Sequence, residues 1–173
     1  MKFYSGFSLK DDEHFFKAYI DSSDYTVSGF SYGAIKAFEY VQKQLKSGNR
    51  VDTLQLFSPA FFQTKSEKFK RLQTISFEKD VEGYTNAFIH QCFLPYSVKN
   101  IKYKEANILD LKYLLYYEWL ISGLLFIKSK GVKIEVYLGS EDKIIDVESA
   151  RILFLEVATV TYIKGANHFL QTN

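Results

Sequence analysis

A β-prone segment, a glycine-flanked turn and an amphipathic helix follow one another within residues 24–46. The segment Asp24–Ser28 reads DYTVS and is rich in residues that favour strands. The turn Gly29–Gly33 reads GFSYG, and from Ala34 to Lys46 apolar residues recur at the spacing of a helix with one buried face. A strand that passes directly into a helix is typical of βαβ units, so this segment favours an α/β fold.

Other parts of the chain repeat this alternation. Further strands are expected at Lys2–Ser5, Val51–Phe57, Val132–Leu138 and Thr159–Ile163. Further helices are expected at Lys10–Ile20 and Asp146–Glu156. Because strands and helices alternate, we predict a mostly parallel sheet with helices on both faces.

The segment between the third and fourth strands reads differently. Residues Ala60–Lys104 look helical, polar and aromatic, and no strand of comparable quality is expected there. A long helix is expected over Asn107–Lys130, with Asn107 as its cap and Gly131 at its end. A chain of 173 residues has the usual length of a single domain. We therefore predict a single domain over residues 1–173, with a helical cap insertion at roughly residues 60–106.

The turn Gly29–Gly33 matches the pattern G-x-S-x-G. A serine hydroxyl must stand clear of the backbone to attack a carbonyl carbon, and a sharp strand-to-helix turn achieves this by holding the serine in a strained conformation. Side chains two residues before and after Ser31 would collide, which explains both glycines. Ser31 is therefore a candidate nucleophile, and the alternative is an ordinary glycine-rich turn between a strand and a helix.

A serine nucleophile needs a base. Of the three histidines, His168 alone follows a predicted strand, in the loop GANHF. His14 falls on the first predicted helix and His90 in the insertion, where a surface or structural role is the simpler interpretation. His168 is therefore the candidate base.

The base in turn needs a carboxylate that fixes its tautomer. Asp142 lies in the loop after the fourth strand, and Glu141 and Asp146 are neighbouring alternatives. The carboxyl ends of parallel strands meet at one edge of the sheet, where ligands gather. We therefore predict that Ser31, Asp142 and His168 meet at that edge, in the chain order expected for this kind of triad.

An oxyanion hole is expected from two backbone N–H groups. The first belongs to Tyr32, at the start of the helix after Ser31, where the helix dipole favours a developing anion. The second is expected in the loop Ser5–Phe7 after the first strand, with Phe7 as the donor and Gly6 allowing close approach.

Charge, cysteine content and hydropathy exclude several classes of protein. The 22 basic and 20 acidic residues give a net charge of +2, which lacks the strong basic excess typical of proteins that bind duplex DNA. Cys92 is the one cysteine, so neither an internal disulfide nor a thiolate-rich zinc site is expected. The most apolar stretch, Tyr113–Ile127, contains Glu118 and is shorter than a membrane span. We expect a cytoplasmic protein without metal, cofactor, nucleic acid or membrane partner.

Four segments together resemble the α/β-hydrolase family. YSGF stands in the place of the oxyanion loop, GFSYG looks like the nucleophile turn, GSEDKII like the acid loop and GANHF like the histidine loop. The resemblance implies a trimmed α/β-hydrolase fold and ester hydrolysis by Ser31, Asp142 and His168. Ser5 stands where the family usually has a histidine, and fewer residues than usual separate Phe7 from the nucleophile strand.

Among compact members, the chain is similar to the short bacterial pimeloyl-[acyl-carrier protein] methyl ester esterases of biotin synthesis. The resemblance implies that it removes a methyl group from a pimeloyl chain held on an acidic acyl-carrier protein. Two functions stay open beside this one: a general small-acyl carboxylesterase or thioesterase, and a non-catalytic binding module.

An acidic carrier needs a basic landing site. Lys65, Lys68 and Arg71 share one face if their segment is helical, and a solvated face is the alternative interpretation. A second basic cluster contains Lys99, Lys102 and Lys104. An apolar channel for the acyl chain, or simply core, is expected from Phe61, Phe62, Phe88, Phe93 and Tyr113.

Overall fold

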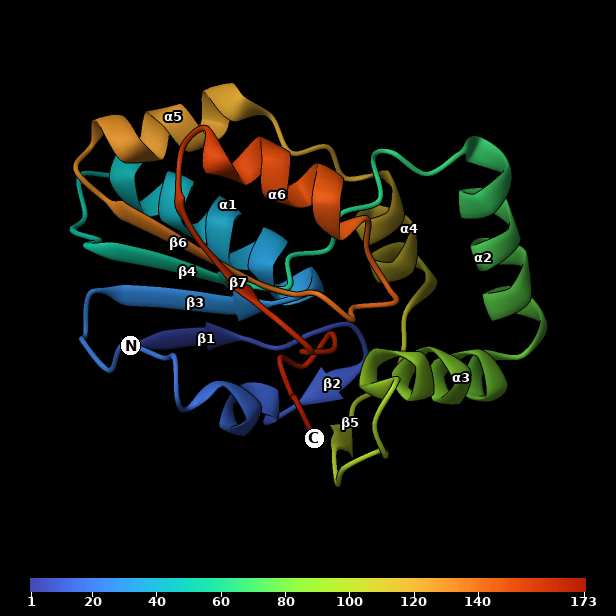
Figure 1. The fold of residues 1–173 in the computed structure, drawn as a ribbon. Helices are drawn as coiled ribbons and strands as arrows, with labels where there is room; N and C mark the ends of the chain where they lie inside the picture. Colours follow the sequence, from blue (N-terminus) through green and yellow to red (C-terminus); the bar gives the residue numbers. More distant parts are fainter.

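Five parallel strands form the central sheet of the computed structural model, which describes residues 1–173 (Figure 1). Their order across the sheet is β1-β3-β4-β6-β7. The strands are β1 (Lys2–Tyr4), β3 (Thr26–Phe30), β4 (Thr53–Phe57), β6 (Lys133–Gly139) and β7 (Thr159–Ile163). All four pairings are parallel, which confirms the predicted α/β class and places every strand's carboxyl end at the same edge.

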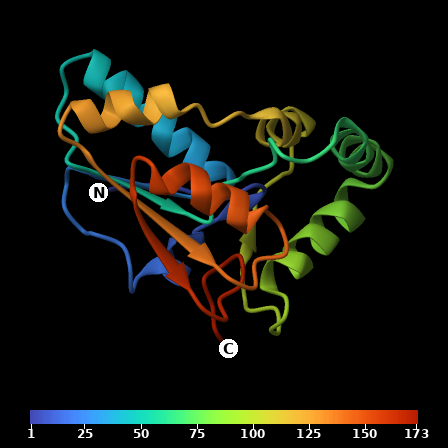
Figure 2. The same cartoon turned by 45° about the horizontal axis from the view of Figure 1, so that its top comes forward.

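Three α-helices cover one face of this sheet: α1 (Tyr32–Lys46), α5 (Ile121–Ser129) and α6 (Val147–Leu155). The view in Figure 2, turned from that of Figure 1, shows the three helices lying together on that side. Beneath them lies an aliphatic layer in which residues of the central strands are fully or almost fully buried, such as Leu54, Leu56 and Val136. This layer packs α1, which begins directly after Ser31, against the sheet.

The opposite face is aromatic and polar. Ser28, Gln55 and Glu135 pair in one row across β3, β4 and β6, so their side chains share this face. The Ser28 hydroxyl donates to Gln55 Oε1 (3.1 Å), and Gln55 Nε2 donates to Glu135 Oε2 (2.8 Å). A 3₁₀ helix, η1 (Asp12–Phe16), covers this face and stacks Phe16 on Phe57 with ring centroids 4.8 Å apart.

The residues between β4 and α5 build a layer beyond the carboxyl edge of the sheet. This layer contains α2 (Glu67–Lys79), α3 (Val81–Phe93) and α4 (Ile108–Tyr116), which lie to the right in Figure 1. One short strand here was not predicted: β5 (Lys102–Tyr103) pairs antiparallel with β2 (Leu9–Lys10), which follows the first sheet strand. The inserted segment is therefore tied to the loop after β1.

The long helix predicted over Asn107–Lys130 is wrong in its middle. Asn107 does cap α4, because its side chain accepts from Leu109 N–H at 2.7 Å, but the helix ends at Tyr116 and α5 begins at Ile121. Trp119 lies in the break, where its N–H donates to Gln63 Oε1 and its indole N–H donates to the Ala60 carbonyl. Burial of this side chain overrides the helical periodicity.

The helix predicted over Lys10–Ile20 is also too long. Only η1 forms, because Asp11 adopts a left-handed conformation (φ 58°) and the Asp12 side chain binds Gly6 N–H at 2.9 Å. None of the helices combines the length and the apolar character that a membrane crossing requires.

Candidate active site

Ser31 lies at the sharp turn between β3 and α1, with φ 52° and ψ −114°. This conformation costs roughly 1–3 kcal/mol for a residue with a side chain. The turn is held by Ser31 N–H, which donates to the Phe57 carbonyl (2.9 Å), and by the Ser31 carbonyl, which accepts from Ala60 N–H (3.1 Å). A Cβ at Gly29 would lie 2.2 Å from the Gly33 carbonyl oxygen, and one at Gly33 would lie 2.0 Å from the Tyr4 carbonyl oxygen. Both glycines are therefore needed.

Ser31, His168 and Asp142 form a hydrogen-bonded series at the carboxyl edge. His168 Nε2 lies 2.9 Å from Ser31 Oγ, and His168 Nδ1 lies 2.6 Å from Asp142 Oδ2. A carboxylate accepts and does not donate, so Nδ1 carries the proton and Nε2 accepts from the serine hydroxyl. Ser31 is 4%, Asp142 7% and His168 0% exposed. The arrangement can remove the serine proton during attack on a carbonyl carbon.

Asp142, and not its neighbour Asp146, occupies the acid position. Its second oxygen, Oδ1, accepts from Ile144 N–H at 2.8 Å, which fixes the carboxylate in the loop after β6. Asp146 instead caps α6: Oδ1 accepts from Ser149 N–H and Oδ2 accepts from the Thr64 hydroxyl. Burial alone would raise the pKa of Asp146, but the hydrogen bonds from Ser149 and Thr64 outweigh it and leave that pKa lowered. Lys143 pairs with Glu141 at the surface.

The loop that carries His168 is held by hydrogen bonds within the loop and by contacts with Phe93 at the end of α3. The Asn167 amide donates to the Phe93 carbonyl (2.8 Å), and its oxygen accepts from the N–H groups of Phe169 and Gln171. Phe169 stacks on Phe93 with ring centroids 4.3 Å apart. These contacts fix the imidazole that Ser31 faces.

The two predicted oxyanion donors belong to separate segments, the start of α1 and the loop after β1. Tyr32 is the first residue of α1, so its N–H has no acceptor within the helix. Phe7 follows β1, and its N–H has no backbone acceptor. A Cβ at Gly6 would lie 2.8 Å from the Phe30 ring, which shows how closely this loop approaches the nucleophile turn. Asp12, which sequence reasoning missed, is fully buried and holds Gly6 N–H. Nothing in the acidic run around Asp12 marks it for this role.

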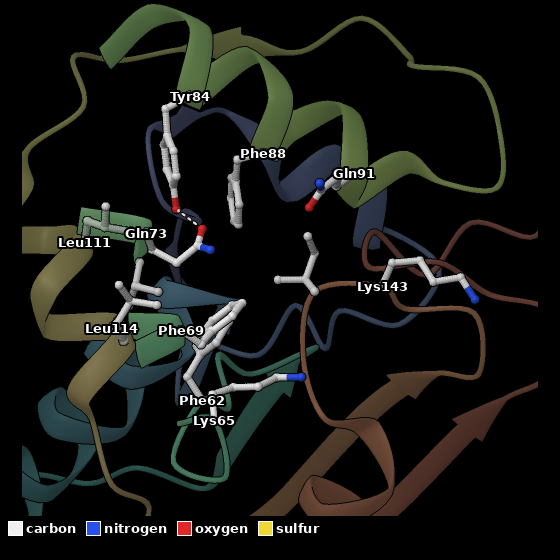
Figure 3. A pocket seen from close by; sticks show the side chains of 12 residues that line it. Phe62, Lys65, Phe69, Gln73, Tyr84, Phe88, Gln91, Leu111, Leu114 and Lys143 are labelled. Carbon is white, nitrogen blue, oxygen red and sulfur yellow. Dashed lines mark hydrogen bonds between the residues drawn. The ribbon is translucent and has the colours of Figure 1, made fainter. Parts of the chain in front are cut away.

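A cavity of about 240 Å³ lies among α2, α3, α4 and the loop after β6 that carries Asp142, and Ser31, His168 and Asp142 themselves are not among its lining residues (Figure 3). Its walls come from α2, α3, α4 and the loop after β6, and Ile144, beside Asp142, is one of them. They comprise Phe62, Lys65, Phe69, Gln73, Tyr84, Phe88, Gln91, Leu111, Leu114, Leu115, Lys143 and Ile144. Of the aromatic residues predicted for an acyl channel, Phe62 and Phe88 line this cavity, and Phe61, Phe93 and Tyr113 do not.

The predicted basic face is wrong in one residue. Lys65 precedes α2, whose N-cap is Ser66, and it lines the apolar cavity. Lys68 and Arg71 lie on α2 and share a hollow of about 520 Å³ with Lys112 of α4. The i, i+3, i+6 spacing predicts a shared face only within a helix, and the helix begins too late to include Lys65.

The second basic cluster is largely engaged within the chain. Lys99 Nζ donates to Gln171 Oε1 at 2.8 Å, and Lys102 pairs with Asp11 at 2.9 Å. His14 and His90 are both exposed, and neither is hydrogen-bonded to Ser31. Burial, and to a lesser degree the Asp142 carboxylate, raise the pKa of the Cys92 thiol. No group of three or more His, Cys, Asp or Glu side chains is placed to hold a metal ion.

Comparison with known proteins gives structural matches only. No protein-family model and no curated protein matches the chain. The crystal structure of BioG from Haemophilus influenzae matches with a TM-score of 0.62 and 12% identity, over 97% of this chain and 87% of that one. An esterase from Exiguobacterium antarcticum matches with a TM-score of 0.60 and 18% identity, over 80% of this chain and 57% of that one.

A third match, naproxen esterase from Bacillus subtilis, has a TM-score of 0.55 and 16% identity, over 85% of this chain and 54% of that one. The chain thus spans little more than half the length of these two esterases. The matches show that the chain has the α/β-hydrolase fold, as predicted.

Proposed function

We propose that this protein is a serine hydrolase that cleaves carboxylic ester bonds. The observation that carries the proposal is the series Ser31–His168–Asp142, with both hydrogen bonds formed and the serine held in a strained turn. Side chains from three loops that are distant in the sequence meet there. A structural role for one of these side chains would not require the other two to lie beside it.

The reaction proceeds by acyl transfer. Ser31 Oγ attacks the ester carbonyl while His168 Nε2 takes its proton, and Asp142 stabilises the resulting imidazolium. The N–H groups of Tyr32 and Phe7 bind the tetrahedral oxyanion. His168 then returns its proton to the departing alcohol, which leaves an acyl group on Ser31. Water attacks this acyl-enzyme by the same route and releases the acid.

For the substrate, we propose the methyl ester of a pimeloyl chain on acyl-carrier protein, so the alcohol released is methanol. The largely apolar cavity, which Ile144 of the Asp142 loop helps to line, supports an aliphatic acyl chain, because such sites are lined by apolar side chains with a few polar groups. The hollow that Lys68, Arg71 and Lys112 line together with a single acid, Glu67, supports an acidic partner outside the cavity. The experiment compares hydrolysis of the carrier-bound ester with hydrolysis of free methyl esters. Preference for the carrier-bound ester is expected, and equal rates would favour a general small-acyl esterase.

Charge reversal at Lys68 and Arg71 separates these two substrates. Both side chains are exposed on α2 and neither contacts the series around Ser31, so the change removes attraction for an acidic carrier without altering the chemistry. We expect kcat/KM of Lys68→Glu/Arg71→Glu to fall about tenfold or more on the carrier-bound ester and to stay within about twofold on free esters.

The matched control is Lys128→Glu/Lys130→Glu. These lysines are exposed at the end of α5, near the amino end of β6 and therefore at the other edge of the sheet. The control alters net charge equally and is expected to leave both activities intact. Equal losses for the two double variants would argue against a carrier surface on α2.

A further inference from the structure

Tyr32 is joined to the inserted segment by its side chain while its backbone faces the nucleophile. Its phenol donates to Asp110 Oδ1 on α4 at 2.6 Å. The Tyr32 side chain is 4% exposed. Burial, and then the Asp110 carboxylate, raise the pKa of this phenol, so it remains a donor. One residue thus links α4 to the peptide that follows Ser31.

The surrounding side chains extend this link along α1. Lys36 Nζ lies over the rings of Tyr32 (5.0 Å) and Tyr113 (4.6 Å), and the Tyr113 phenol donates to Glu39. Two tyrosine–carboxylate hydrogen bonds therefore connect α1 and α4, but they run in opposite directions. Only one of them involves a residue adjacent to Ser31.

We propose that Asp110, acting through the Tyr32 phenol, is a positioning residue that holds Tyr32 N–H in the oxyanion hole. The proposal rests on the hydrolase function proposed above. Charge-assisted O–H···O⁻ bonds are among the strong hydrogen bonds of proteins, and this one anchors a side chain in the first turn of α1. Displacing an oxyanion donor by about 1 Å costs on the order of a hundredfold in rate.

The other predicted donor is anchored to the same inserted segment. The Phe7 ring packs against Phe77 of α2 and Phe88 of α3, with ring centroids 6.2 Å and 5.8 Å apart. The Ser8 hydroxyl donates to the Lys104 carbonyl at 2.8 Å, beside the β2–β5 pairing. Both sides of the oxyanion hole therefore depend on residues between β4 and β6, and Asp110 is the polar contact on the Tyr32 side.

The test is hydrolysis of p-nitrophenyl acetate, whose two-carbon acyl group is too short to need the apolar cavity. Tyr32→Phe and Asp110→Ala are each expected to lower kcat about tenfold with little change in KM, because the lost interaction acts on the transition state. The double variant is expected to be no slower than the singles, because the two changes remove one interaction. Asp110→Asn keeps an oxygen acceptor and is expected to recover part of the rate.

The matched control is Tyr113→Phe, which removes the other α1–α4 hydrogen bond from a residue that does not line the cavity. It is expected to lower the unfolding midpoint less than Tyr32→Phe does, because Tyr113 is exposed and Tyr32 is buried, and to leave kcat within about twofold. Equal kcat for Tyr32→Phe and Tyr113→Phe, or multiplicative losses in the double variant, would overturn the positioning role. If the wild-type protein is inactive on this ester, the proposed hydrolase function is contradicted, and the positioning role that rests on it is contradicted as well. If Tyr32→Phe fails to fold, kcat of Asp110→Asn tests the same hydrogen bond from its other partner.

Discussion

Ser31→Ala is expected to lower kcat for ester hydrolysis at least about 10⁴-fold, because the nucleophile is removed and the histidine has nothing to deprotonate. The Ser31 hydroxyl is the group that His168 Nε2 faces at 2.9 Å, and no other hydroxyl is hydrogen-bonded to that nitrogen. Loss of this one buried hydrogen bond costs roughly 1–3 kcal/mol of unfolding free energy, which leaves most chains of this size folded. The measurement is the rate on a short activated ester, with circular dichroism as the check on folding.

Ser28→Ala is the matched control for this variant. Ser28 is a buried serine on β3, three residues before Ser31, and its hydroxyl donates to Gln55 Oε1 instead. The two variants are expected to lose similar stability, but only Ser31→Ala is expected to lose activity. A Ser31→Ala preparation with the wild-type rate would show that the esterase activity comes from elsewhere.

Asp142→Asn is expected to lower kcat about 10⁴-fold, close to the effect of removing the nucleophile. An amide in place of the carboxylate can present N–H groups to His168 Nδ1, which favours the tautomer with its proton on Nε2. That nitrogen then no longer accepts from Ser31. The Ile144 N–H bond to Oδ1 is retained by the amide oxygen, so the loop is expected to keep its shape.

Asp146→Asn, four residues along, distinguishes this effect from a general loss of negative charge. Asparagine caps helices about as well as aspartate, so α6 is expected to remain intact and kcat to stay within about twofold. The measurement is kcat for both variants on the same ester. Comparable losses at the two positions would contradict the assignment of Asp142 as the acid.

Positions set by topology were predictable from the sequence. Ser31, Asp142 and His168 each follow a strand, and parallel strands bring those positions to one edge whatever lies between them. The glycine pattern around Ser31 was equally informative, since backbone atoms fill the space that a side chain would need at Gly29 or Gly33. These are local or topological constraints, and a single sequence carries them.

Features that depend on tertiary contacts were not predictable. Trp119 breaks a periodic apolar stretch because the buried indole finds its acceptor at Ala60, far away in the chain. The role of Asp12 depends on a loop closure to Gly6, and that of Asp110 on a contact 78 residues away in sequence. Nothing in either acid's local sequence distinguishes it from a solvated one. The start of α2 at Glu67 depends on capping by Ser66, and it leaves Lys65 outside the helix that contains Lys68.

A fluorophosphonate probe reports on the reactive serine without a choice of substrate. Its phosphorus is attacked only by a serine whose proton a neighbouring base removes and whose oxyanion is stabilised. Mass spectrometry of the labelled wild-type protein is predicted to show one adduct, mapped to Ser31 and absent from Ser31→Ala. A folded protein that stays unlabelled, or carries the adduct at another residue, would contradict the proposed catalytic role of Ser31.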